Sequence, residues 1–148
     1  MALTRSAMVK IVHDYMDACT VGIPDRIAAY FEPDAVHYFP PGMYEGPFRS
    51  ATTIADRWAT AVANLGSQWT VDAIAVDTEA QTAVCEWTHF KVRDQVLLRG
   101  TEWYEFSERG LITEIRAYYA SPQDASLTAL ELGGFDYLSR GYPIEPTR

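Results

Sequence analysis

The spacing of apolar residues along this chain changes near Gly66 from a helical period to a strand period. Before that point, residues 4–19 and 51–65 repeat apolar side chains every three or four positions, which predicts two helices with one buried face each. A shorter helix is expected to begin at Pro24 and to continue through DRIAAYF, and EPDAVHYFPP adds a few extended residues. A chain of helices followed by strands is expected to pack its helices on one face of a sheet.

After Gly66, apolar and polar residues alternate in four runs, which are expected to be strands: residues 68–77, 82–93, 96–107 and 111–120. The short polar turns TEAQ, DQ and ERG join them, so neighbouring strands are expected to run antiparallel and to curve at Gly100. The expected fold class is α+β: a cone in which three N-terminal helices pack on a curved antiparallel sheet and enclose a pocket.

Length and charge restrict the class of protein. Residues 1–148 are expected to form one domain, in which residues 121–148 form a C-terminal helix and a tail that could cover the pocket. The net charge of −8, without a basic cluster, argues against nucleic-acid and membrane partners. The opening residues MALTRSAMVK lack the apolar core of a signal peptide, and Cys19 and Cys85 are expected to be buried thiols in a reducing compartment. A cytoplasmic location is expected.

Three stretches resemble the nuclear transport factor 2-like superfamily: DYMDACTVGIPDRIAAYFEPDAVHYFPPG, EGPF and GLITEIRAYYASP. Within it, the chain is most similar to the SnoaL-like enzymes, ketosteroid isomerase and scytalone dehydratase, and the resemblance runs from Met8 to about Ser121. It implies a pocket for a small hydrophobic or aromatic substrate, and a homodimer or higher homo-oligomer. The dimer is expected to form through the outer face of the sheet, where Trp103 is expected to be exposed. It does not specify a reaction, because the superfamily includes isomerases, dehydratases, hydrolases, cyclases and binding subunits.

The resemblance to ketosteroid isomerase implies roles for single residues. Tyr15 falls where that enzyme has its oxyanion-hole tyrosine, and Glu102 falls where it has its second oxyanion-hole group, a protonated aspartic acid. The proton-shuttling aspartate of that enzyme falls on Phe39, which cannot carry a proton. Steroid isomerisation by the usual mechanism is therefore not expected.

Other branches of the superfamily point to histidines. The catalytic acid of the limonene epoxide hydrolases falls at His89, but their other acid falls on Ala120, which argues against epoxide hydrolysis by that machinery. Scytalone dehydratase uses histidines, a part that His89 and His37 could play here. Its aromatic tail resembles GGFDYLSRGY, in which Phe135 and Tyr137 would close the mouth of the pocket.

Strand alternation supports a site on the hairpin of residues 82–107. It places His89 on one face with Trp87, and it aims Glu102 to the same side from the next strand. Such a pair could exchange a proton, which typically contributes about 10²–10⁴ in rate. The expected catalytic residues are His89 as base, Glu102 as its partner, His37 as a second proton carrier and Tyr15 as a donor to the substrate oxygen. The expected cavity wall consists of Phe39, Trp58, Trp87, Tyr104 and Tyr119.

Structural roles remain open for each of these residues. His89 could be satisfied by a backbone or tyrosine partner, Tyr15 could be core, and Glu102 could be an exposed carboxylate paired with Arg99 or Lys91. The three histidines lack metal-ligand spacing, and no phosphate-binding or nucleophile motif occurs, so neither a metal nor a cofactor is expected.

The expected function is that of a cofactor-independent lyase, which dehydrates an aromatic or polycyclic molecule or cleaves it by a retro-aldol step. An isomerase or polyketide cyclase using the same groups is the first alternative, and the mass of the product separates the two. A non-catalytic binding or subunit domain is the second alternative, which a cavity smaller than a few ring systems would favour.

Overall fold

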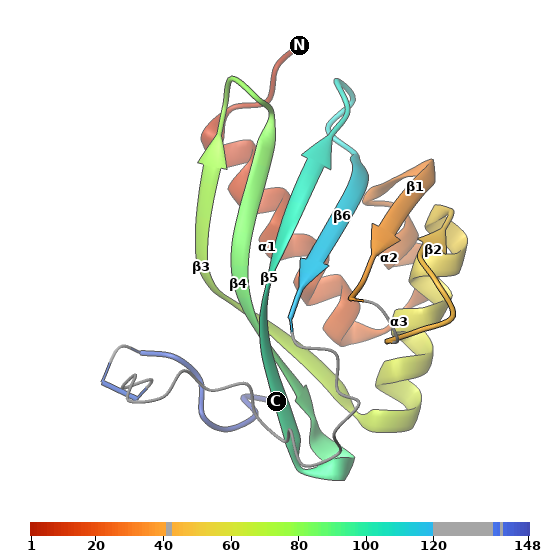
Figure 1. Cartoon of the computed structure of the whole chain (residues 1–148), viewed down its shortest axis with the longest axis vertical. Helices are drawn as coiled ribbons and strands as arrows, with labels where there is room; N and C mark the ends of the chain where they lie inside the picture. The colour runs from red at the N-terminus through yellow and green to blue at the C-terminus, as the bar shows by residue number, and fades with distance from the viewer. Residues whose placement is uncertain (41–42, 120–137, 140) are drawn as a thin grey trace.

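Helices occupy the first part of the chain and strands the second, as the change in apolar spacing predicts (Figure 1). The structure is a computed structural model that describes residues 1–40, 43–119, 138–139 and 141–148. Its elements are α1 (Arg5–Val21), α2 (Pro24–Ala28), β1 (Phe31–Tyr38), β2 (Phe48–Arg49), α3 (Ala51–Leu65), β3 (Ser67–Asp77), β4 (Thr82–Lys91), the 3-10 helix η1 (Val92–Asp94), β5 (Val96–Phe106) and β6 (Ile112–Tyr118). The predicted α+β class is confirmed.

The two long helices begin and end at residues suited to caps. The Thr4 side chain accepts a hydrogen bond from the backbone of Ala7 at the start of α1, and Ser50 does the same for α3. Each helix ends at a glycine with positive φ, 76° at Gly22 and 64° at Gly66. These local signals explain why the predicted bounds of α3 agree with the structure.

Within the described residues, the sheet has six strands in the order β2-β1-β6-β5-β4-β3. The predicted antiparallel meander corresponds to β3–β6. It is extended by β1, which pairs in parallel with β6 and places His37 opposite Ile115, so the complete sheet is mixed. The short second helix ends at Ala28, and Phe31 already belongs to β1, because Phe31, Ala35 and His37 alternate into the core.

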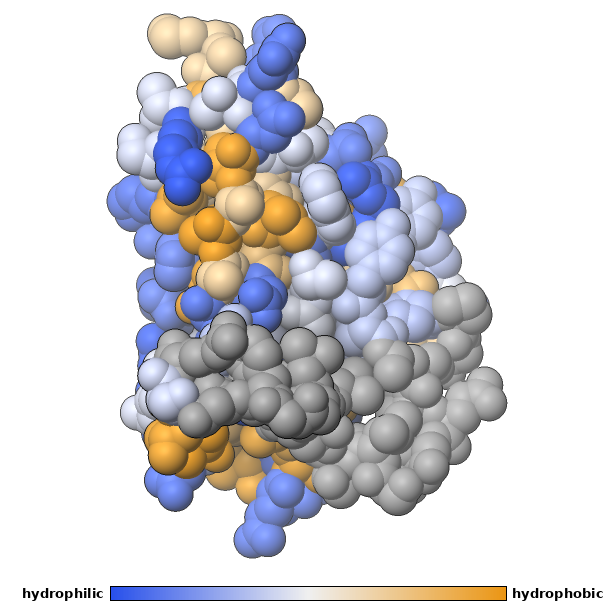
Figure 2. Space-filling model, turned by 60° about the vertical axis from the view of Figure 1, so that its left-hand side comes forward, coloured by the Kyte–Doolittle hydropathy of each residue, from blue (hydrophilic) through white to orange (hydrophobic). Residues whose placement is uncertain are grey.

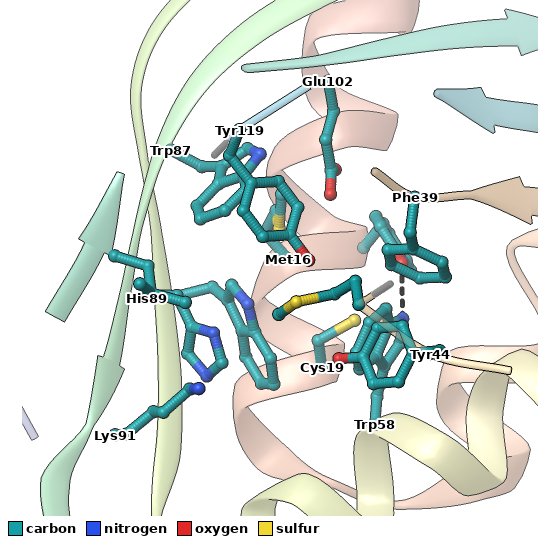
Figure 3. Close-up of a pocket in the computed structure, with 14 residues that line it drawn as sticks. Met16, Cys19, Phe39, Tyr44, Trp58, Trp87, His89, Lys91, Glu102 and Tyr119 are labelled. Carbon is teal, nitrogen blue, oxygen red and sulfur yellow. Dashed lines mark hydrogen bonds between the residues drawn. The ribbon is translucent and has the colours of Figure 1, made fainter. Parts of the chain in front are cut away.

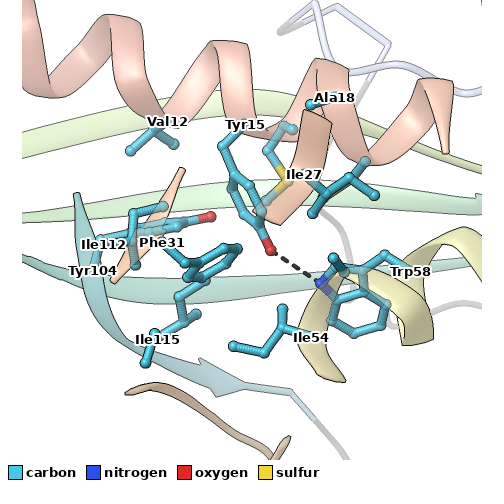
Figure 4. Packing of buried hydrophobic residues seen from close by; sticks show 14 of the residues in the cluster. Val12, Tyr15, Ala18, Ile27, Phe31, Ile54, Trp58, Tyr104, Ile112 and Ile115 are labelled. Carbon is cyan, nitrogen blue, oxygen red and sulfur yellow. Dashed lines mark hydrogen bonds between the residues drawn. The ribbon is translucent and has the colours of Figure 1, made fainter. Parts of the chain in front are cut away.

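The helices and the inner face of the sheet share one apolar core (Figure 4). At its centre Trp58 Nε1 of α3 donates a hydrogen bond of 3.0 Å to the hydroxyl of Tyr15 on α1. The Tyr15 ring packs edge-on against Phe31 and Tyr104, with ring centroids 5.2 and 6.1 Å apart. This packing fixes α1 and α3 against the strands that carry the polar residues of the site. Cys19 and Cys85 are buried free thiols.

The indole of Trp87 packs against β5 at Gly100. The two residues are opposite each other in the β4–β5 ladder. A Cβ atom at position 100 would lie 2.5 Å from Cζ2 of Trp87, closer than two carbon atoms can approach. Only glycine therefore allows the indole to occupy this place in the wall of the cone.

Gly100→Ala is expected to lower the free energy of unfolding by about 1–3 kcal/mol, because the indole has to move. Urea denaturation measures this effect. In a Trp87→Leu background, which lacks the indole, the same substitution should cost clearly less. An equal cost in both backgrounds would show that the contact is not the cause.

The described end of the tail contacts the outer face of the sheet. Arg99 Nη2 donates a hydrogen bond of 2.9 Å to the carbonyl of Pro143, and the Tyr142 hydroxyl lies 3.1 Å from both carboxylate oxygens of Glu86. Within the described residues, no helix is both long enough and apolar enough to cross a membrane.

Candidate active site

A cavity lies between α1, α3 and the inner face of the sheet (Figure 3). Its lining is mostly aromatic: Tyr15, Phe39, Tyr44, Trp58, Trp69, Trp87 and Tyr119. Met16, Cys19, Met43 and Leu98 also belong to the lining, and His89, Lys91 and Glu102 supply its imidazole, ammonium and carboxylate groups. The unfilled volume is about 30 Å³, enough for about two water molecules. A ligand with an aromatic ring therefore has to displace side chains, of which the methionines are the most adaptable.

Glu102 is the one carboxylate among the described residues that line this cavity. It lies on β5, it is 7% exposed, and its carboxylate points into the cavity in Figure 3. The hydroxyl of Tyr104 donates a hydrogen bond of 2.6 Å to Oε2. The other oxygen, Oε1, lies 3.6 Å from Nε2 of His37. Two neighbouring groups thus hold the carboxylate in position while it still faces the cavity.

His37 is completely buried behind the cavity wall. Its ring stacks on Phe39 with a centroid distance of 4.2 Å, and its Nδ1 lies 3.3 Å from the carbonyl of Tyr38. A carbonyl can only accept, so Nδ1 carries the hydrogen in this contact. Nε2, which has no hydrogen-bond partner among the described residues, faces Oε1 of Glu102. The two residues form a buried pair.

His89 has other partners. Its Nε2 lies 2.8 Å from the hydroxyl of Ser67, and its ring stacks on Trp69 with a centroid distance of 4.4 Å. Burial, with a smaller contribution from the charge of Lys91, lowers the pKa of His89 from 6.5 to about 3. The imidazole is therefore neutral at neutral pH.

The predicted partners His89 and Glu102 both lie on the inner face, but the structure does not bring them into contact. Glu102 is opposite Cys85 in the β4–β5 ladder, and His89 is four residues further along β4. That separation is about 13 Å along the strand. Figure 3 shows the two side chains entering the cavity from different ends. The histidine that lies beside Glu102 is His37, which comes from β1, whereas the sequence predicts His89 there.

The cavity also contains two groups that can donate hydrogen bonds to a ligand oxygen. Tyr15 accepts a hydrogen bond from Trp58, and burial raises its pKa well above the usual value, so the phenol stays protonated. Trp87 is 4% exposed, and its Nε1 has no partner among the described residues. Buried donors of this kind are normally satisfied, which makes a ligand oxygen the natural partner.

The other predicted wall residues differ in their position relative to the cavity. Phe39, Trp58 and Tyr119 line the cavity, whereas Tyr104 lies behind Glu102 in the core. Phe135 and Tyr137 lie outside the described residues, so their role in closing the mouth stays a prediction.

Trp69 forms part of the wall beside His89 and is not among the predicted wall residues. Its signal was the alternation in β3, which places Trp69 opposite His89 and hence on the inner face. In the described part of the chain, no three His, Cys, Asp or Glu side chains are grouped as a metal site would require.

Comparison with known proteins relates the chain to a protein family. The family model for the SnoaL-like domain matches residues 12–115. No curated protein matches the sequence. A solved structure from Methylobium petroleophilum PM1, a protein of unknown function with a cystatin-like fold, is 51% identical, with a TM-score of 0.79 over 100% of this chain and 98% of that chain.

Two further solved structures share the fold at low sequence identity. One is SalBIII, an epoxide hydrolase/cyclase-like enzyme of pyran ring formation in the polyether salinomycin, at 11% identity and a TM-score of 0.63 over 76% of this chain and 90% of that chain. The other is a putative polyketide cyclase from Sinorhizobium meliloti, at 18% identity and a TM-score of 0.61 over 74% of this chain and 94% of that chain.

Proposed function

Because the chain belongs to the SnoaL-like domain family, we propose that it is an acid–base enzyme that acts on a small aromatic molecule without a cofactor. The reaction we propose is a lyase step, either dehydration or retro-aldol carbon–carbon cleavage. The observation that supports it is the Glu102 carboxylate, which faces an aromatic cavity while Tyr104 and His37 hold it.

In a dehydration, Glu102 takes a proton from a carbon of the substrate, the electron pair of that bond forms a carbon–carbon double bond, and hydroxide leaves. The leaving hydroxide takes the proton back from Glu102 and departs as water, which restores the enzyme. In a retro-aldol cleavage, Glu102 takes the hydroxyl proton instead, and the broken carbon–carbon bond leaves an enolate that takes the proton up. His37 would hold the carboxylate in position, and Trp87 Nε1 and the Tyr15 hydroxyl would bind the substrate oxygen.

An isomerase or a cyclase would use the same groups, and it remains the first alternative. It differs in that the abstracted proton returns to another atom of the same molecule, so the mass does not change. Two low-identity neighbours are described as cyclases or cyclase-like enzymes, which is a reason to test this alternative beside the lyase.

A non-catalytic domain is a second candidate, and the small unfilled volume of about 30 Å³ favours it. In that case the cone is filled by its own side chains and admits no ring. A thermal shift screen with aromatic compounds tests whether the cone admits a ring, because a ligand that binds only the folded protein raises its Tm.

Product analysis tests the proposed reaction directly. Aromatic β-hydroxy carbonyl compounds are incubated with the wild type and with Glu102→Gln, and the masses of the products are measured by mass spectrometry. We expect products lighter by one water, or two fragments, from the wild type alone. Products of unchanged mass would assign the isomerase or cyclase. Unchanged starting compounds would assign the non-catalytic domain, as a binding domain if they raise the Tm and as a subunit domain with a filled cone if they do not.

We also propose that the protein is a homodimer formed through the outer face of the sheet. Trp103 is 40% exposed there, in a groove that it lines with Ala75 and Val84. Figure 2 shows hydrophobic residues gathered on the side of the molecule that carries β3. Light scattering is expected to give the mass of a dimer for the wild type and of a monomer for Trp103→Glu. A monomeric wild type would contradict the proposal.

A further inference from the structure

Lys91 is the one basic residue among the described residues that line the cavity. It lies at the end of β4, on the same face as Trp87 and His89. No described acidic side chain forms an ion pair with it. The chain has only one other lysine, Lys10, which lies on the exposed surface of α1 and pairs with Asp14.

Lys91 and Glu102 lie at opposite ends of the cavity. Glu102 is opposite Cys85, six residues along β4 from Lys91, which corresponds to about 20 Å along the strand. Figure 3 shows the Lys91 side chain beside His89 and the Glu102 carboxylate at the other end, with aromatic rings between them. The cavity therefore has a positive end and a negative end joined by an apolar wall.

This polarity would select and orient a ligand. An ammonium group without an acidic partner attracts an anion, and charge-assisted contacts of this kind are among the stronger hydrogen bonds. His89 is neutral and carries no competing charge. An anion at Lys91 also lies far from the Glu102 carboxylate, so the two negative charges do not repel strongly. The rest of the ligand then points its reactive part toward Glu102.

We propose that Lys91 binds an anionic group of the substrate, a carboxylate or phenolate, and that the substrate is therefore an aromatic anion. The part of the molecule that reacts at Glu102 follows from the proposed function, whereas anion binding at Lys91 does not depend on it. In a protein of net charge −8, this local positive charge is what allows an anionic ligand to enter.

Two probes of nearly equal shape test the proposal: naphthoate, which is charged, and naphthylmethanol, which is not. Quenching of tryptophan fluorescence reports binding, because Trp58, Trp69 and Trp87 line the cavity. We expect the wild type to bind naphthoate about tenfold more tightly or better. Lys91→Met should remove this preference and leave naphthylmethanol binding unchanged. Lys91→Arg should keep it, and so should the control Lys10→Met.

Equal affinities in the wild type, a preference that survives Lys91→Met, or no binding of either probe would overturn the proposal. Glu102→Gln distinguishes this failure from failure of the proposed function. If only the proposed function is wrong, the affinity for naphthoate still depends on Lys91. The rate of proton abstraction is then the same in Glu102→Gln as in the wild type. If only the anion site is wrong, Glu102→Gln still abolishes proton abstraction.

Discussion

Glu102→Gln should slow the abstraction of a proton from carbon by at least about 100-fold, the lower range for loss of a general base. Glutamine has nearly the same shape and can still accept the hydrogen bond from Tyr104, but it cannot take up a proton. Nitrobenzisoxazole is a suitable aromatic probe, since removal of its ring proton breaks the nitrogen–oxygen bond and releases a coloured phenolate. Absorbance of that phenolate gives the rate without knowledge of the natural substrate.

The matched control is Glu108→Gln, which removes the same charge from the exposed turn between β5 and β6. It should react at the wild-type rate. Thermal melts of both variants establish that each is folded at the assay temperature. Equal rates for the wild type and a folded Glu102→Gln would contradict the role of Glu102 as base.

Acidification from about pH 6.5 to about pH 3 should remove on the order of 4 kcal/mol of unfolding free energy through His89. Burial lowers the pKa of His89 from 6.5 to about 3, so between these values the unfolded chain binds a proton there and the folded chain does not. Stability therefore falls as the pH falls through this window, and the contribution is complete above about pH 6.5. Urea denaturation at a series of pH values measures it.

His89→Gln isolates this contribution, since its side chain does not titrate and can still hydrogen-bond with Ser67. Its stability should depend less steeply on pH than that of the wild type, and the difference between the two curves cancels the effect of the carboxylates. His13→Gln, on the exposed side of α1, is the control for replacing a histidine elsewhere in the chain. Parallel curves for the wild type and His89→Gln would show that His89 is not held neutral by burial.

The sequence predicts the elements of this fold well, because their signals are local. The bounds of α3 follow from a cap, an apolar stripe and a terminal glycine, and the meander follows from alternation and polar turns. The pairing of β1 with β6 could not be predicted in the same way. It joins residues 31–38 to residues 112–118, and nothing in either segment specifies a parallel partner.

The sequence predicts correctly that His89 and Glu102 lie on the inner face of the sheet, but it does not predict the register of the β4–β5 ladder. A two-residue DQ turn would place Glu102 opposite Trp87, next to His89. The structure has the 3-10 helix Val92–Asp94 at this point, so the ladder pairs Lys91 with Val96 and Glu102 with Cys85. A shift of two residues keeps both side chains on the inner face and separates them. His37 reaches Glu102 only through the long-range pairing of β1, which neither segment specifies by itself.

The central claim is that Glu102 works with His37 and not with His89, and a double-mutant cycle on the nitrobenzisoxazole rate tests it most directly. His37→Gln should slow the wild type but have little further effect on Glu102→Gln, which corresponds to a coupling of about 0.5–3 kcal/mol between groups in contact. His89→Gln should change both backgrounds by the same factor. Coupling of Glu102 to His89, with none to His37, would contradict the account.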